Sequence, residues 1–205
     1  MTYSQRQEAQ LQRFLEWKES EGGMEWPTHY RTLFQISQRA RLSWLTTFSV
    51  GRVLEVGCNT GAVLSWVTAD RPVPDPPHMG LDINPRNIEL ARVLAPELAF
   101  EVGDACHLPF GDESFDCVLV PETLEHLDFE AEVPQAVREA LRVARSRVLI
   151  TMPNGVIDTP EACSFKHRYL LDADHLEALR GLLPTCAVAW VGPFICILAS
   201  KGALP

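Results

Sequence analysis

The chain has 205 residues, 46% of them hydrophobic, and its 18 basic and 27 acidic side chains give a formal net charge of −9. This length and composition predict one globular domain with a small appendage, and the acidic balance disfavours a nucleic-acid duplex as partner. The apolar runs are too short to span a membrane and the first ten residues lack a signal-peptide pattern, so we expect a cytoplasmic protein.

Two helical patterns open the chain, over residues 5–20 and 28–48. A segment with two glycines and a proline, EGGMEWP, interrupts them. We therefore expect residues 1–50 to form an N-terminal helical cap and residues 51–205 to form the main domain.

From residue 52 onwards, short apolar runs alternate with helical patterns. Such alternation predicts a mainly parallel sheet with helices on both faces, a three-layer α/β sandwich. The last two apolar runs leave no room for a crossover helix, so we expect an antiparallel hairpin at Gly192-Pro193 that supplies an antiparallel edge strand. The pattern predicts seven strands, over residues 52–57, 77–83, 98–104, 115–121, 146–153, 186–192 and 194–200.

The stretch VLEVGCNTGAVL (53–64) is typical of a strand, a tight turn and a helix. Gly57 and Gly61 permit positive φ, and the helix N-terminus offers free N–H groups. The G-x-x-x-G spacing differs from the G-x-G-x-x-G dinucleotide fingerprint, and Glu55 stands two residues before the first glycine. An acid at the mouth of this turn would repel a pyrophosphate. The pattern favours a ligand that carries an amino or sulfonium group.

Two further acids follow the next predicted strands. Asp82 in GLDIN can accept hydrogen bonds from a ribose diol, while Asp104 in VGDACHLPF, with the N–H of Ala105, can bind an adenine edge. Taken singly, each acid is equally consistent with a turn or a helix cap. Their order along the chain indicates a nucleoside ligand.

The stretches EVGCNTG, GLDIN, GDACHLPFGDESFDCV and PETLEHL, in this order, resemble class I S-adenosylmethionine-dependent methyltransferases of the type 11, ubiquinone-pathway-like subgroup. The resemblance runs from residue 52 to about residue 200 and implies a Rossmann-like fold with S-adenosyl-L-methionine as cofactor. Asn59 replaces the middle glycine of the family's turn, and asparagine tolerates left-handed geometry. By resemblance, the cofactor-binding residues are Glu55, Gly57, Cys58, Asn59, Gly61, Asp82, Ile83, Asp104, Ala105, Pro121 and Glu122.

The PETLEHL stretch (121–127) follows the fourth predicted strand, where the methyl acceptor would face the cofactor. On a helix, Glu122, Glu125 and His126 would share one face. They could be structural, with Pro121 in a first helical turn and acids favouring the helix dipole. Alternatively, His126 is a general base or orients the acceptor, and we take it as the catalytic candidate.

A third interpretation is a metal site. E-x-x-E-H resembles the metal-binding motif of small-RNA 3′-end 2′-O-methyltransferases and the matching stretch of ubiquinone-pathway O-methyltransferases. His167, after TMPNG, would then join Glu122, Glu125 and His126, a ligand set that suits Mn²⁺, Fe²⁺ or Zn²⁺. All three interpretations stay open at this point, and a divalent metal is a candidate cofactor.

The resemblance implies methyl transfer to a small-molecule acceptor, with oxygen favoured over nitrogen or carbon. The alternatives are metal-assisted 2′-O-methylation of RNA 3′ ends, a non-catalytic cofactor-binding subunit and an NAD-dependent oxidoreductase. We expect a monomer or homodimer, with the acceptor pocket beneath Trp26, His29, Tyr30 and Arg31. None of the six cysteines forms C-x-x-C, so we expect them to be reduced and used as small hydrophobes: Cys58, Cys106, Cys117, Cys163, Cys186 and Cys196.

Overall fold

The structure is a computed structural model that describes residues 28–153 and 172–202, with side chains from Gln38 onwards in the first of these ranges. The predicted helix over residues 5–20, together with Trp26, Cys163 and His167, lies outside the described residues. The same holds for the side chains of His29, Tyr30 and Arg31. Within the described ranges, no helix is long and apolar enough to cross a membrane.

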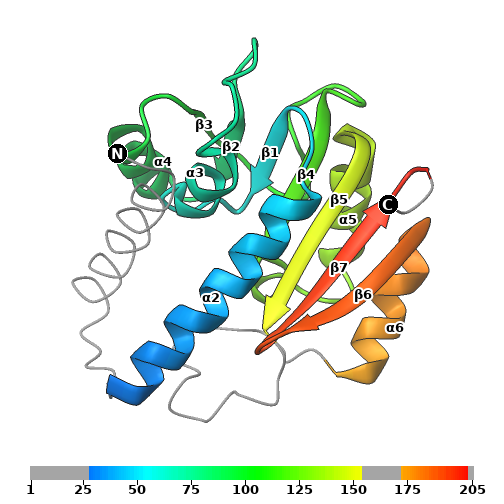
Figure 1. Ribbon diagram of the computed structural model, residues 1–205. Helices are drawn as coiled ribbons and strands as arrows, with labels where there is room; N and C mark the ends of the chain where they lie inside the picture. Colours follow the sequence, from blue (N-terminus) through cyan, green and yellow to red (C-terminus); the bar gives the residue numbers. More distant parts are fainter. Residues whose placement is uncertain (1–27, 154–171, 203–205) are drawn as a thin grey trace.

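Seven strands form one sheet in the order β3-β2-β1-β4-β5-β7-β6 (Figure 1). The first five run parallel, while β7 runs antiparallel to both β5 and β6. The predicted sheet and its closing hairpin are therefore confirmed, and β7 lies between β5 and the edge strand β6. The strands are β1 (Val53–Val56), β2 (Met79–Asp82), β3 (Ala99–Val102), β4 (Phe115–Pro121), β5 (Ala144–Pro153), β6 (Thr185–Val191) and β7 (Phe194–Ser200).

Helices cover both faces of the sheet, as the alternating pattern predicts. In Figure 1, α2, α3 and α4 lie on the near face, and α5 and α6 lie behind the sheet. The helices are α2 (Thr28–Phe48), α3 (Ala62–Thr68), α4 (Pro85–Leu94), α5 (Val133–Val143) and α6 (Ala173–Leu182), with a short 3₁₀ helix η1 (Leu124–His126). Pro85 opens α4, and the side chain of Asn84 caps it by accepting the N–H of Arg86.

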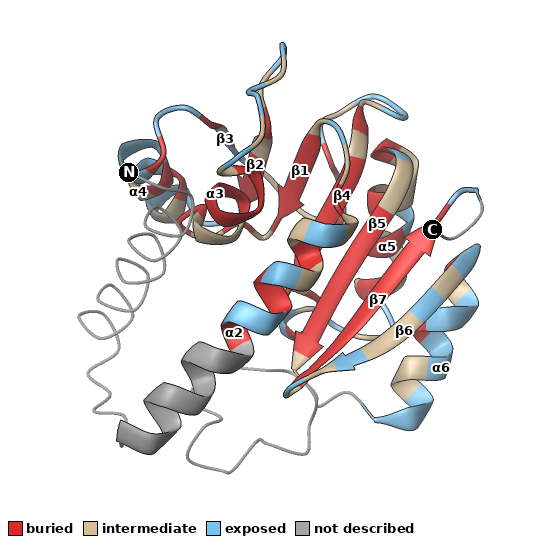
Figure 2. Ribbon diagram, in the orientation of Figure 1, coloured by how far each residue is buried: buried red, intermediate tan, exposed pale blue. Residues whose placement is uncertain are grey.

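The core consists of two apolar layers, one on each side of the sheet, whose central strands are buried (Figure 2). Alternation along β1 sends Leu54 into the layer beneath α5 and Val53 into the layer beneath α3 and α4. Helix α2 adds Leu42 and Leu45 to this second layer, so its C-terminal half packs on the sheet. The boundary between a cap and a main domain at residue 50 stays a prediction.

Four of the five cysteines that the structure describes are buried, and Cys186 is partly exposed. The five that the structure describes are all free thiols, which confirms the prediction for those five. Burial raises the pKa of Cys117 and of Cys196 to about 12, so both are protonated near neutral pH.

Candidate functional site

Left-handed backbone geometry shapes the turn between β1 and α3. Gly57, Asn59 and Gly61 have φ values of 73°, 48° and 76°. The N–H groups of Gly57 and Cys58 both donate to the carbonyl oxygen of Leu81, at 2.7 and 2.9 Å, which ties the turn to the end of β2. Asn59 thus occupies the conformation that its residue type tolerates best after glycine.

The two glycines of this turn are also required by packing inside the protein. A Cβ atom on Gly57 would lie 2.3 Å from Oγ1 of Thr123, and one on Gly61 would lie 2.6 Å from the ring of Phe100. Larger residues are therefore excluded at both positions by neighbouring side chains, in addition to the positive φ.

Glu55 lies inside the fold, whereas the sequence pattern placed it at the mouth of the turn; that expectation is wrong. Its side chain is only 1% exposed because β1 is a central strand covered by helices. Oε2 accepts the N–H of Leu64 at 2.7 Å, one of the free amides at the start of α3. Burial raises the pKa of this carboxyl well above its usual value, which the bond from Leu64 partly offsets. Its role as a cofactor contact stays a prediction.

Asp82 links three segments at the end of β2. Oδ2 accepts the N–H of Asn59 at 2.8 Å, and Oδ1 accepts the N–H of Asn84 at 2.8 Å and the side-chain amide of Asn87 at 3.2 Å. A carboxylate offers about four acceptor positions, so about one remains for a ligand. Two hydrogen bonds to a ribose diol would displace a bond that the protein already makes.

An apolar side chain and an unpartnered polar atom flank Asp82. Ile83 is 73% exposed, which is unusual for an isoleucine next to a buried strand. Oδ1 of Asn59 is buried and has no hydrogen-bond partner. Both features are available to a bound nucleoside, one by apolar contact and the other as an acceptor.

Asp104 forms a local turn after β3. Oδ1 accepts the N–H of Cys106 at 2.8 Å, and Oδ2 lies 3.0 Å from Nδ1 of His107. The bonds from His107 and Cys106 lower the pKa of this carboxyl, so it is ionised. The carbonyl of Asp82 accepts the N–H of Gly103, which places Asp104 and Ala105 beside the end of β2. An adenine edge at Asp104 would compete with protein donors.

The residue that follows β4 has a left-handed backbone conformation. Pro121 is the last residue of β4, so the interpretation that places it in the first turn of a helix is wrong. Glu122 has a φ of 47°, and its N–H donates to the carbonyl of Thr151 at 2.7 Å. The strand therefore ends at Pro121, as the predicted range of 115–121 has it, and η1 starts only at Leu124.

Glu125 and His126 do not share a face. Glu125 is 2% exposed, whereas His126 is exposed to solvent. The cause is the backbone: Glu122 precedes η1, and consecutive residues of a 3₁₀ helix project about 120° apart. Neither carboxyl oxygen of Glu125 has a hydrogen-bond partner, and burial raises the pKa of this carboxyl well above its usual value.

The side chain of Arg41, in α2, also lies at the end of β4, and the sequence analysis did not identify it as a site residue. Its guanidinium forms an ion pair with Glu122, is 4% exposed, and lies 5.1 Å from the ring centre of Phe194. It also contacts the side chains of Gln38 and Thr151. No local motif marks this arginine, since its partner is 81 positions away in the sequence.

The described residues contain no cluster of side chains that could bind a metal ion. Among them, no three His, Cys, Asp or Glu side chains are placed to hold a metal ion. His167, the fourth candidate ligand, lies outside the described ranges. The proposed set of Glu122, Glu125, His126 and His167 therefore stays a prediction.

Comparison with known proteins identifies the family. A family profile described as "Methyltransferase domain" matches residues 54–151, the stretch from β1 to β5 that carries every turn described above. The sheet order and the antiparallel β7 agree with the fold of that family. The chain belongs to the class I S-adenosylmethionine-dependent methyltransferases.

Curated relatives of this methyltransferase match over a shared central segment. This chain is 36% identical over 102 residues to the demethylmenaquinone methyltransferase of Roseiflexus sp., and the match covers 47% of this chain and 40% of that protein. It is also 33% identical over 104 residues to the ajmaline N-methyltransferase of Rauvolfia serpentina, and this match covers 48% of this chain and 34% of that protein. The chain thus spans well under half the length of these relatives.

A solved structure supports the fold over nearly the whole chain. The magnesium protoporphyrin IX methyltransferase of Synechocystis, solved with S-adenosylhomocysteine bound, superposes with a TM-score of 0.67 at 13% identity, over 93% of this chain and 95% of that one. At this identity the likeness concerns the fold alone.

S-adenosyl-L-methionine is the methyl donor of this family, and its binding by the residues at the carboxyl ends of β1 and β2 stays a prediction. Ligands of open α/β sheets bind at this edge. Here the turn over residues 57–61 has left-handed backbone geometry, Oδ1 of Asn59 has no hydrogen-bond partner among the described residues, and Ile83 offers an exposed apolar surface. Asp82 and Asp104 add ionisable oxygens beside them.

Proposed function

We propose that the methyltransferase transfers a methyl group from S-adenosyl-L-methionine to a small-molecule acceptor, with oxygen as the favoured acceptor atom. The observation that carries the proposal is the convergence of the β1 turn, Asp82 and the end of β4 at one edge of the sheet. Thr123, directly after β4, has its hydroxyl 3.0 Å from the carbonyl oxygen of Val56, so the acceptor segment touches the cofactor turn.

The donor supplies an activated methyl group on sulfur, so the chain's own task is mainly to position the acceptor and exclude water. Buried walls at the ends of β4 and β5 serve this task, with Arg41 and Glu122 closing one side. A hydroxyl acceptor must also lose a proton, which calls for a base. His126 is the histidine nearest in sequence to the end of β4, and its exposed position lets it reach a bound acceptor.

Nitrogen is the second candidate acceptor atom. An N-methyltransferase is among the relatives, and an uncharged amine needs no base before transfer. The two cases differ in their dependence on His126, because only the hydroxyl needs to be deprotonated at or before the transition state.

A paired acceptor screen tests the proposal. The purified chain is incubated with S-adenosyl-L-methionine and a panel of phenols, catechols and amines, with and without a chelator, and S-adenosylhomocysteine is quantified. We expect turnover on a phenol or catechol that falls at least about tenfold in His126→Gln, since a positioned base contributes about 10²–10⁴-fold. The matched control, His175→Gln on α6, should keep its rate.

Each outcome of the screen has a fixed meaning. Turnover on amines alone would replace oxygen by nitrogen, and an unchanged rate in His126→Gln would remove the base role. Loss of turnover on chelation would support the metal interpretation. Absence of turnover with every acceptor, despite cofactor binding, would favour a non-catalytic cofactor-binding subunit.

A further inference from the structure

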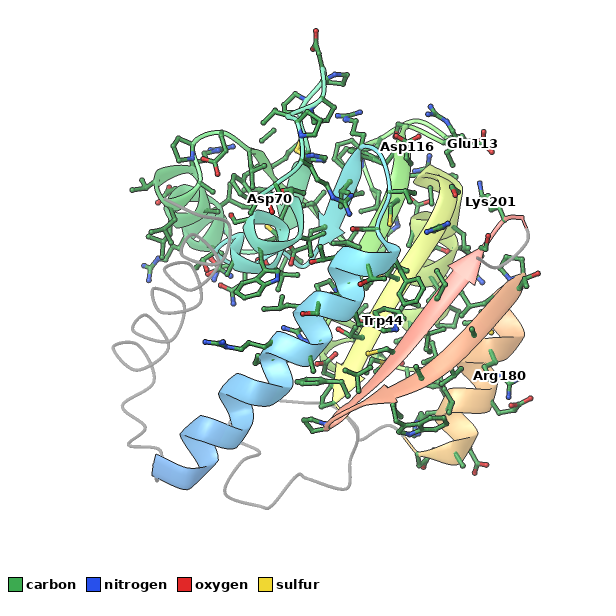
Figure 3. The ribbon with its side chains drawn as sticks, in the orientation of Figure 1. Trp44, Asp70, Glu113, Asp116, Arg180 and Lys201 are labelled. Carbon is green, nitrogen blue, oxygen red and sulfur yellow. The ribbon has the colours of Figure 1, made fainter. Side chains whose placement is uncertain are left out.

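A hollow of about 760 Å³ lies at the amino ends of the strands, the edge opposite to the proposed methyl-transfer site. Its walls come from residues 49–52 before β1, from residues 71–78 before β2, and from the starts of β4 and β5. Figure 3 labels Asp116 at this edge, where β4 begins. The volume falls in the range of small-molecule pockets, about 300–1,000 Å³.

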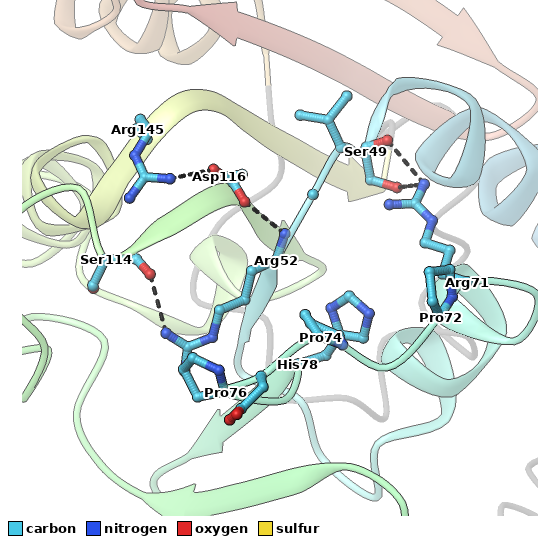
Figure 4. A pocket seen from close by; sticks show the side chains of 13 residues that line it. Ser49, Arg52, Arg71, Pro72, Pro74, Pro76, His78, Ser114, Asp116 and Arg145 are labelled. Carbon is cyan, nitrogen blue, oxygen red and sulfur yellow. Dashed lines mark hydrogen bonds and ion pairs between the residues drawn. The ribbon is translucent and has the colours of Figure 1, made fainter.

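Basic side chains from three separate segments line this hollow, although the chain as a whole carries a net charge of −9. Arg52 immediately precedes β1, Arg71 follows α3, and Arg145 lies in β5 (Figure 4). Nη1 of Arg145 pairs with Oδ1 of Asp116 at 2.7 Å, while Oδ2 of the same carboxylate accepts the backbone N–H of Arg52 at 2.8 Å. Asp116 is therefore engaged by the protein on both oxygens.

The guanidinium of Arg52, in contrast to that of Arg145, does not pair with a carboxylate in the part of the chain that the structure describes. Its Nε donates to the carbonyl of Pro77 at 3.0 Å and its Nη1 to that of Ser114 at 3.1 Å, both uncharged groups. Its stem is fixed, because the guanidinium lies 4.2 Å from the ring centre of Phe115. Within the described residues, no carboxylate forms an ion pair with this guanidinium, so it presents a fixed positive charge at the wall.

His78 supplies an unused donor at the same wall. The side chain is 2% exposed, and Nδ1 accepts the N–H of Val53 at 3.1 Å, so the ring proton is on Nε2. That Nε2 has no hydrogen-bond partner. Burial, and to a smaller extent the charges of Arg71 and Arg52, lowers the pKa of His78 to about 4, so the ring is neutral near neutral pH.

A second unpartnered polar atom and a rigid apolar rim complete the hollow. Oγ of Ser114 is buried and has no hydrogen-bond partner within the described ranges. Leaving a buried polar group without a hydrogen bond costs about 1–3 kcal/mol. Pro72, Pro74 and Pro76 lie in the same wall segment as His78 (Figure 4), and their rings fix φ, so this wall is largely preformed. Anion-binding groups and an apolar surface therefore line one cavity.

We propose that this hollow is a second binding site, for a small amphipathic molecule with a phosphate or carboxylate group. The oxyanion binds Arg52 and accepts from His78 and Ser114, and the apolar part contacts the proline wall. The site is separate from the methyl-transfer edge and does not depend on the proposed function.

Calorimetric titration with three matched probes tests this site. Phenyl phosphate and benzoate carry the two candidate oxyanions on one apolar ring, and benzyl alcohol carries none. We expect the wild-type chain to bind at least one of the two anions and not the alcohol. Arg52→Met should weaken that binding at least about tenfold, since a charge-assisted hydrogen bond is lost. Arg138→Met, which removes an exposed arginine on α5 outside the hollow, is the control.

Two further measurements keep the test decisive if Arg52→Met does not fold. Arg145→Gln changes a side chain that is 59% exposed, so it should fold and should weaken binding a few-fold through the lost positive charge. The ring nitrogen resonances of His78 should shift when the anion is added. The proposal is overturned by absence of anion binding, by equal affinity in Arg145→Gln and Arg138→Gln, by an unmoved His78 signal, or by displacement of the probe by S-adenosylhomocysteine.

Discussion

Arg41 of α2 forms a partly buried ion pair with Glu122, the residue that follows β4 in left-handed geometry. The pair joins the N-terminal helix to the site edge across 81 positions of sequence. Oγ1 of Thr151 in β5 lies 3.2 Å from the same carboxylate oxygen of Glu122, so three elements meet at one group. The position of α2 over the sheet is thus coupled to the backbone that borders the acceptor.

A double-mutant cycle tests this coupling. Arg41→Met leaves a partly buried carboxylate without its partner and should lower the free energy of unfolding by about 1–3 kcal/mol. Glu122→Gln in the same chain should recover part of that loss, because the stranded charge is removed. Urea unfolding of the four proteins measures the interaction energy; a value of zero would mean that the pair does not hold α2 in place.

The contact between Gly57 and Thr123 predicts a specific rescue. Gly57→Ala places a Cβ atom against Thr123 at a φ of 73° and should cost about 2 kcal/mol or more. Adding Thr123→Ala should restore only the steric share of the loss. Thermal unfolding measures both, with Gly181→Ala, where a Cβ atom meets nothing, as the control. If Gly57→Ala were as stable as this control, the turn would not have the geometry described.

Glu55 predicts a pH dependence of stability. Its pKa is raised in the folded chain, so the folded state binds the proton more tightly than the unfolded state, whose value is near 4.5. This group therefore favours folding most below pH 4.5, and its contribution falls as the pH rises toward the folded pKa, by about 1.4 kcal/mol per pH unit.

Glu55→Gln isolates that contribution, because the amide oxygen can still accept the N–H of Leu64. We expect the variant to gain stability relative to the wild type as the pH increases above 4.5, measured by urea unfolding at several pH values. A difference that stays constant with pH would contradict the buried, protonated carboxyl.

Much of the fold follows from patterns that the sequence displays directly. Parallel central strands are buried on both faces, so β1, β4 and β5 appear as near-continuous apolar runs, and the spacing of the last two runs requires a hairpin. The glycine-containing turn could also be predicted from the sequence, since glycine and asparagine, here Gly57, Asn59 and Gly61, are the residue types that best adopt positive φ.

The details of the site depend on contacts that no local pattern encodes. PETLEHL has helical spacing, but the pairing of β4 with β5 extends to Pro121 and leaves Glu122 left-handed, which keeps Glu122 out of the short helix that holds Glu125 and His126. Glu55 has the appearance of a loop acid until the order of the strands places it in the interior. Arg41 meets Glu122 only through the tertiary fold.

The most direct test is a calorimetric titration of S-adenosylhomocysteine into the purified chain, compared with Asp82→Ala and with the control Asp70→Ala. The described geometry predicts saturable binding to the wild type and to Asp70→Ala, and an affinity at least about tenfold lower in Asp82→Ala, which loses a ligand contact and the anchor of Asn59. Absence of binding to the wild type, or equal affinity in Asp82→Ala, would contradict a cofactor site at this edge of the sheet.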